Sequence, residues 1–272
     1  MRALRLVVAG LLAALPVVAH AGETVRLFAA GSLREPLTEV ARLFEAREGS
    51  RVETRFGASG LLRDEIAAKD GADVFASANM EHPRSLAEAG RSGPAVLFAR
   101  NRLCALARPG LEATSADVVD RMLDPAVKLG ASTPKADPAG DYAWAVFRKI
   151  DGLRPGSFET LDRKALKLTG GPSSPPPPRD RNPYGALIAD GKADLFLTYC
   201  TNAQAAACEV SGARVVDLPD PIGVAADHGL TVLNDAPPGA FRLALFMLSP
   251  EAQGLLARHG FAAPNLPQRT TP

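Results

Sequence analysis

Two hydrophobic patterns alternate along the first part of the chain. Short apolar or alternating runs, which are typical of β-strands, cover residues 24–30, 51–56, 72–78 and 95–107. Segments with apolar residues at helical spacing separate these runs, at residues 33–49, 61–71 and 82–90. A repeated strand–helix order favours a mostly parallel sheet with helices on both faces. We therefore expect an α/β protein.

The same order begins again after Pro109 and Gly110. Helix-like segments cover residues 115–123, 139–150 and 185–193, and strand-like segments cover 127–132, 194–200 and 213–219. A proline-rich run at 169–183 interrupts this second unit, because proline continues neither a helix nor a central strand. Its four consecutive prolines favour an extended polyproline II segment on the surface. A strand at 230–235 and helices from residue 241 onward complete the pattern.

The first 21 residues have the features of a secretory signal peptide. Arg2 and Arg5 precede an apolar run at 6–18, and a small-x-small cleavage site ends at Ala21. The run is too short to span a bilayer of about 30 Å as a helix, so a membrane anchor is the weaker alternative. We expect export to the periplasm and a mature chain that starts near Gly22.

The charge balance argues against one class of partner. The chain has 31 basic and 30 acidic residues, and cleavage removes Arg2 and Arg5 but no acidic residue, which leaves 29 and 30. A nearly neutral mature chain lacks the polybasic surface that nucleic-acid binding favours. We expect no nucleic-acid partner. The hydrophobic content of 46% suffices for one large core or two of ordinary size.

Three cysteines are present. In an oxidising compartment Cys200 and Cys208 could form a disulfide that closes a short loop. The alternative is that both are small buried hydrophobic residues. We interpret Cys104, inside an apolar run, as a residue of a core strand. The cysteine spacings match no zinc-binding pattern, and we expect no direct metal-ion ligands.

Two serine turns join predicted strands to predicted helices. Ser32 lies in the motif AAGSL, and Ser59 lies in FGASGLL. A helix N-terminus attracts anions through its unpaired amides and the helix dipole. Either serine alone is more simply explained as an N-cap. Because both follow consecutive strands, at the edge where parallel sheets bind ligands, an anion site becomes a competing interpretation.

Four stretches resemble the periplasmic molybdate-binding proteins of ABC transporters, over nearly the whole mature chain. They are VRLFAAGSL, RFGASGLLRDEI followed by ADVFASAN, DPAGDYA, and GALIADGKADLFLTYCTNA followed by GLTVLND. The resemblance implies the two-lobed type II periplasmic binding protein fold, in which the ligand cleft lies between the lobes. On this basis we assign residues 22–102 and 222–272 to lobe one. Residues 103–221, with the proline-rich loop 169–183, form lobe two.

The resemblance also implies a site for a dehydrated oxyanion, molybdate or tungstate. Ser32 and Ser59 would offer hydroxyl and backbone donors from lobe one. Ala139 would offer a backbone N–H from lobe two, and Tyr199 its phenolic O–H. Neutral donors can hold a dianion, because hydrogen bonds to a charged acceptor are stronger than neutral ones. We expect no cofactor beyond this ligand, and a monomer that docks on an ABC permease in the inner membrane.

The chain departs from the family pattern at two places. Gly31 stands where relatives usually have another serine, which removes one hydroxyl. Pro183 begins the helix whose first turn supplies a further backbone donor in the family, and proline has no N–H. Either Tyr184 takes this role or the contact is lost. Sulfate or a small organic anion therefore stays open as the ligand.

A secreted serine hydrolase is the alternative from another class. Ser59 does not lie in a G-x-S-x-G elbow, because Leu61 occupies the place of the last glycine. The histidines of the mature chain, which we interpret as solvated, lie near no serine in a catalytic pattern; they are His82, His228 and His259. We predict a binding protein and not an enzyme.

Overall fold

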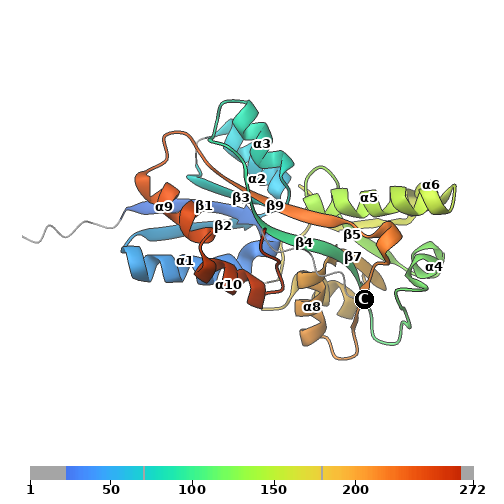
Figure 1. Ribbon diagram of the computed structural model, residues 1–272. Helices are drawn as coiled ribbons and strands as arrows, with labels where there is room; N and C mark the ends of the chain where they lie inside the picture. Colours follow the sequence, from blue (N-terminus) through green and yellow to red (C-terminus); the bar gives the residue numbers. More distant parts are fainter. Residues whose placement is uncertain (1–22, 70, 179, 265–272) are drawn as a thin grey trace, which may run out of the picture.

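The computed structural model describes residues 23–69, 71–178 and 180–264 (Figure 1). The predicted signal peptide, residues 1–21, lies outside the described residues. Within the described ranges, no helix is long and apolar enough to cross a membrane.

The first body of the molecule is built from the strand–helix pairs that the hydrophobic pattern predicts. Strands β1 (Thr24–Ala30), β2 (Arg51–Gly57) and β3 (Val74–Ser77) pair in parallel, with β1 in the middle. They are followed by helices α1 (Arg34–Glu48), α2 (Ser59–Ala68) and α3 (Glu81–Glu88), and the 3-10 turn η1 (Gly31–Leu33) joins β1 to α1. Helix α1 ends at Gly49, whose φ of +68° is a left-handed cap that glycine adopts without strain.

The second body repeats the arrangement. Strands β5 (Leu129–Ser132), β6 (Leu166–Thr169) and β7 (Leu195–Tyr199) pair in parallel around β5. Its helices are α4 (Val118–Leu123), α5 (Pro138–Leu153), α6 (Ser157–Lys164), α7 (Pro183–Ala189) and α8 (Cys200–Glu209). The sequence pattern missed β6, α6 and α8. Helix α8 buries only small residues and cysteine. Its alanine-rich sequence has a high helix propensity, but it lacks the spacing of large apolar residues by which other helices are predicted.

Two long strands connect the bodies. Residues 96–102 of β4 (Val96–Ala107) pair antiparallel with β9 (Ala225–Val232), and residues 103–107 pair antiparallel with β7 and β8 (Arg214–Asp217). Strand β9 also pairs antiparallel with β3. The sheet therefore runs β2-β1-β3-β9-β4-β7-β5-β6 through the whole molecule, with β8 beside β4. The predicted run at 95–107 is thus one strand shared by both bodies (Figure 1).

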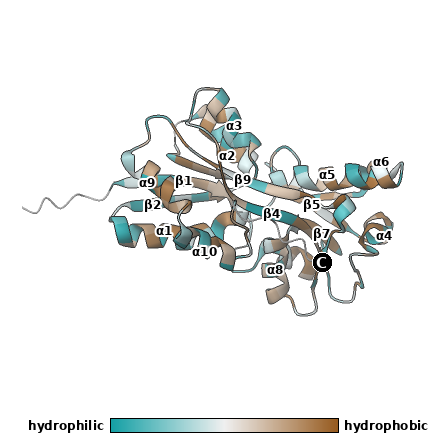
Figure 2. Ribbon diagram, in the orientation of Figure 1, coloured by the Kyte–Doolittle hydropathy of each residue, from teal (hydrophilic) through white to brown (hydrophobic). Residues whose placement is uncertain are grey.

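The end of the chain returns to the first body. After β9, helices α9 (Pro238–Met247) and α10 (Pro250–Arg258) pack against α1, and α9 also lies against β1. The amide of Gly239 in α9 donates to Glu23 Oε2 at 2.7 Å. Figure 2 shows apolar residues along interior strands such as β1 and β7, and hydrophilic residues on parts of helices such as α1, α3 and α6.

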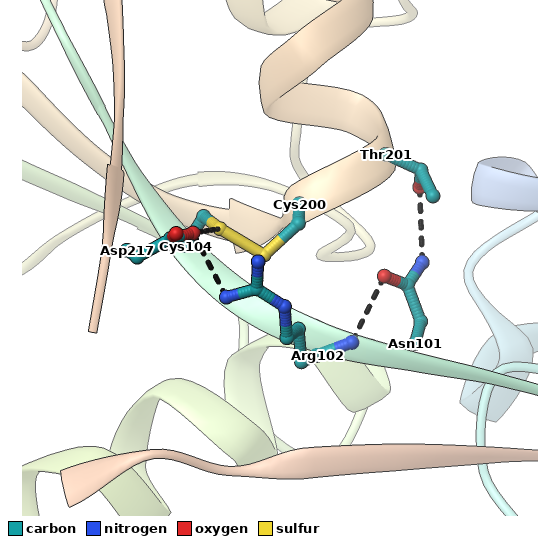
Figure 3. Close-up of a disulfide and its surroundings, with 6 residues drawn as sticks. All are labelled: Asn101, Arg102, Cys104, Cys200, Thr201 and Asp217. Carbon is teal, nitrogen blue, oxygen red and sulfur yellow. Dashed lines mark hydrogen bonds and ion pairs between the residues drawn. A yellow bond between two sulfur atoms is a disulfide. The ribbon is translucent and has the colours of Figure 1, made fainter. Parts of the chain in front are cut away.

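Neither interpretation of Cys200 and Cys208 is correct, because they form no disulfide with each other and Cys208 is not buried. The structure joins Cys104 of β4 to Cys200 at the start of α8, with Cα atoms 4.8 Å apart, and leaves Cys208 free and exposed (Figure 3). Residues 200 and 208 belong to one helix, and eight residues at 1.5 Å each separate them by about 12 Å along its axis. Antiparallel pairing of β4 with β7 instead brings Cys200 beside Cys104.

Candidate functional site

The two serine turns meet at one edge of the sheet. Parallel pairing sets Ala30, the last residue of β1, opposite Gly57, the last residue of β2. Ser32 follows in η1, and its Oγ is buried with no hydrogen-bond partner among the described residues. Ser59 begins α2 and is 1% exposed, and its Oγ accepts a hydrogen bond from the amide of Ala78 at 3.1 Å. A buried hydroxyl without a partner is costly, which marks Ser32 as a donor available to a ligand.

The second body faces these turns with the loop between β5 and α5. The amide of Gly60, in the first turn of α2, donates to the carbonyl of Ala136 at 2.9 Å. A Cβ atom on Gly60 would lie 2.4 Å from the carbonyl oxygen of Lys135. The two bodies are therefore in direct backbone contact beside Ser59, and only a glycine allows that approach.

Ala139 lies in the first turn of α5, immediately after this loop. It is 1% exposed, and its amide donates to Oδ1 of Asp137 at 3.0 Å, so Asp137 is the N-cap of the helix. An aspartate N-cap followed by proline is a typical helix start. The amide that the family resemblance assigns to an oxyanion thus has a carboxylate oxygen as its acceptor.

Tyr199 reaches across from the second body to the first. It ends β7, is 2% exposed, and its hydroxyl donates to the carbonyl of Ala78 at 3.5 Å. The same Ala78 gives its amide to Ser59, so one residue links both predicted donors. Burial raises the pKa of Tyr199 well above its ordinary value, which keeps the phenol protonated and able to donate.

Tyr184 lies in the first turn of α7 in the second body and is half-buried. Its amide donates to Oδ1 of Asn182, the N-cap of α7, at 3.0 Å, and its ring packs on Phe196 with centroids 5.3 Å apart. Pro183 occupies the first helical position. The first amide of α7 therefore already has an acceptor on its own helix.

Asp137 is the polar group of this region that sequence reasoning missed. Burial raises the pKa of its carboxyl to about 6, against the opposing effect of the Ala139 amide. The motif DPAG predicts either a donor at Ala139 or an ordinary helix that starts at Asp-Pro, and the structure shows this helix start with Asp137 as its N-cap. The aspartate in this motif could have indicated a carboxylate near Ala139, because an N-cap carboxylate lies beside the amides that it caps.

Two histidines interpreted as solvated are in fact buried. His228 on β9 is fully buried with its ring 5.4 Å from that of Tyr199, and burial lowers its pKa to about 4. His82 on α3 is 5% exposed, and burial is also the main cause that lowers its pKa. The aromatic rings of Phe98, Tyr199 and Phe261 surround His228. In the described ranges, no hydrogen bond joins a histidine ring to a serine hydroxyl.

One cluster contains residue types that often bind metal ions, but its cysteines are not available as ligands. The ligand atoms of Cys104, Cys200 and Asp217 lie within 4.8 Å of one another. The two sulfur atoms are bonded to each other, so neither is available as a thiolate. Asp217 is instead paired with Arg102 at 2.8 Å (Figure 3).

Comparison with known proteins identifies the fold and the family. Residues 25–262 match the model of the bacterial extracellular solute-binding protein family. The uncharacterized protein PM1146 of Pasteurella multocida is 38% identical over 77% of this chain and 87% of its own. The molybdate-binding protein ModA of Mycobacterium tuberculosis is 27% identical over 95% of both chains.

Two solved structures have the same architecture. The periplasmic molybdate-binding protein of Azotobacter vinelandii superposes with a TM-score of 0.71 at 20% identity, over 90% of this chain and all of that one. The sulfate-binding protein SubI of Mycobacterium tuberculosis gives 0.73 at 20% identity, over 89% and 88%. These likenesses confirm the type II periplasmic binding protein fold that the sequence predicts. The chain belongs to the family of bacterial extracellular solute-binding proteins and is not an enzyme.

Proposed function

We propose that the protein captures a tetrahedral oxyanion, molybdate or tungstate by preference, and delivers it to an ABC permease. The observation that carries the proposal is the buried, unpartnered Oγ of Ser32, at the edge where two serine turns meet the N-terminus of α5. The name of the ModA relative supports molybdate as the first candidate.

The proposed ligand donors are the residues that the family resemblance assigns. From the first body they are Ser32 and Ser59; from the second, Ala139, Tyr184 and Tyr199. Ala139 and Tyr199 would exchange a protein acceptor for a ligand oxygen when the anion binds. For Tyr199, whose present acceptor is the neutral carbonyl of Ala78, this exchange is favourable because a hydrogen bond to a charged oxygen is about twice as strong as a neutral one.

Anion binding would favour closure of the two lobes. Lobe one consists of residues 22–102 and 222–272, and lobe two of residues 103–221. Bonds that join the two bodies support this mechanism, namely Gly60 to Ala136 and Tyr199 to Ala78. A ligand shifts such an equilibrium only through its better binding to one state. The closed form, as a monomer, would then dock on the permease.

The proposed compartment is the periplasm, reached through cleavage of a signal peptide at residues 1–21. The disulfide between Cys104 and Cys200 supports an oxidising compartment. The family, whose description is extracellular, supports export.

Thermal melting with and without oxyanions tests the proposal. Molybdate or tungstate is expected to raise the melting temperature more than sulfate or phosphate. A ligand at about 1,000 times its Kd stabilises the native state by about 4 kcal/mol. If no oxyanion shifts the melt at millimolar concentration, the proposal is wrong.

Sulfate is the second candidate. Gly31 favours it, because the missing hydroxyl changes the donor set expected for molybdate, and the sulfate-binding protein SubI has the same fold. Competition titration of sulfate against molybdate separates the two, since the preferred anion displaces the other at lower concentration.

A further inference from the structure

Asp137 places a carboxyl group beside the proposed anion. Its Oδ1 lies 3.0 Å from the amide nitrogen of Ala139, which is one of the proposed donors. A ligand oxygen bound to the same N–H would also lie about 3 Å from that nitrogen, so the ligand oxygen and Oδ1 would be at most about 6 Å apart. An anion held by Ala139 would therefore lie within about 6 Å of the Asp137 carboxyl.

Among the described residues, the groups that act on the Asp137 carboxyl are uncharged or acidic. The groups that face it are Ser132 of β5, Asp141 of its own helix, Tyr184 of α7 and Tyr199 of β7. On the remaining side lies Gly170, where a Cβ atom would come 2.4 Å from Oδ2. Within the described ranges, no lysine, arginine or histidine forms an ion pair with this carboxylate.

Like charges at this distance in a poorly solvated site repel each other strongly. A proton on the carboxyl removes the repulsion and turns an acceptor into a donor. The amide of Ala139 would then be free to bind the anion, and the Asp137 O–H would donate to an anion oxygen. Burial already raises the pKa of Asp137 to about 6, so the proton is readily gained near neutral pH.

Building on the proposed function, we infer that capture of an unprotonated oxyanion such as molybdate takes up one proton from solvent, held on the carboxyl of Asp137. The proton neutralises the carboxylate, so it offsets one of the two negative charges that the dianion brings into the site. Above about pH 6, affinity should fall about tenfold for each pH unit, which makes binding about 100-fold weaker at pH 8 than at pH 5.5. Asp137 thereby sets the pH range in which the protein retains its ligand.

Calorimetric titration with molybdate between about pH 5.5 and 8.5 tests this inference. Repeating each titration in two buffers of different ionisation enthalpy measures proton uptake directly. The native protein should take up close to one proton at pH 7.5. Asp137→Asn cannot ionise and offers a side-chain N–H donor in place of the carboxyl O–H, so its affinity should be independent of pH and about 100-fold above that of the native protein at pH 8.

Asp141→Asn is the matched control. Asp141 lies one turn further along α5, also has a raised pKa, and accepts from the amide of Lys135 at 2.8 Å. This variant should retain the tenfold loss for each pH unit. The role of Asp137 is overturned if the molybdate affinity of the native protein does not change with pH. It is also overturned if Asp141→Asn abolishes the dependence of affinity on pH. Failure of every oxyanion to bind at any pH would instead contradict the proposed function.

Discussion

The amide of Gly60 donates to the carbonyl of Ala136 at 2.9 Å, and this bond joins helix α2 of the first body to the loop before α5 of the second. It lies beside Ser59 and close to the cap of Ala139 by Asp137. The proposed anion donors from the two bodies are therefore brought together by a backbone contact that involves no side chain.

Gly60→Ala should weaken oxyanion binding without unfolding the protein. The added Cβ would lie 2.4 Å from the Lys135 carbonyl and 2.7 Å from that of Ala136, so the two bodies could not approach. Alanine suits a helix, and separation of the bodies relieves the clash, so the melting temperature without ligand should change little. We expect the Kd, measured by calorimetry, to rise at least about tenfold.

Gly254→Ala provides the control for this prediction. Gly254 is also helical, in α10, and a Cβ atom there would meet nothing within 4 Å. Its affinity should equal that of the native protein. Equal affinities for the Gly60 and Gly254 variants would show that binding needs no close approach of the two bodies.

Ser32→Ala should separate binding from stability. The Ser32 Oγ has no described partner, so its loss should leave the unliganded melt unchanged or slightly raise it. Loss of a hydrogen bond to a charged ligand costs about 1.5–3 kcal/mol, which is about 10- to 100-fold in Kd. An unchanged Kd would remove Ser32 from the site.

Ser59→Ala should behave differently in the same measurements. Ser59 accepts from the amide of Ala78 inside the protein, so its loss leaves a buried donor unpaired. We expect a lower melting temperature, equivalent to about 1–3 kcal/mol, together with weaker binding. Calorimetric scans of the unliganded proteins distinguish the two serines.

Removal of both Cys104 and Cys200 should destabilise the protein. Their disulfide links residues 96 positions apart, and a closed loop of about this length restricts the unfolded chain by roughly 4–5 kcal/mol in the chain-entropy model. Urea unfolding of the double serine variant is expected to show a loss of about 2–5 kcal/mol.

Cys208→Ser serves as the comparison for the disulfide, because Cys208 is free and exposed. Its unfolding free energy should match that of the native protein. Peptide mapping without reduction should recover Cys104 linked to Cys200. Recovery of a peptide in which Cys200 is linked to Cys208 would contradict the observed pairing.

His228 should make the protein less stable in acid. Its pKa is lowered from 6.5 to about 4 in the folded state, so the unfolded chain binds more protons between these values. Stability therefore falls as the pH decreases from 6.5 toward 4, by up to about 3 kcal/mol.

Comparison of native protein with His228→Gln isolates this effect. Asp137, whose pKa is raised, acts in the opposite direction over a similar range and is present in both proteins. Melting curves from about pH 7 to 4.5 should decline less steeply for the variant. Parallel curves would mean that His228 is not the buried acid-sensitive group.

The sequence alone determined the features that depend on neighbours along the chain. Strands β1 and β2 and helices α1 and α2 follow from local hydrophobic period, and this period is enough to place Ser32 and Ser59 at strand ends. Two consecutive parallel strands carry their carboxyl ends to one edge, which made an anion site predictable there.

Only the tertiary structure decided which distant residues meet. The pairing of Cys104 with Cys200 depends on β4 lying antiparallel to β7, and the burial of His228 depends on β9 running between the bodies. The environment of Asp137 likewise comes from other elements packed around one helix start. Such contacts join segments far apart in sequence, and no local period records which of them will be neighbours.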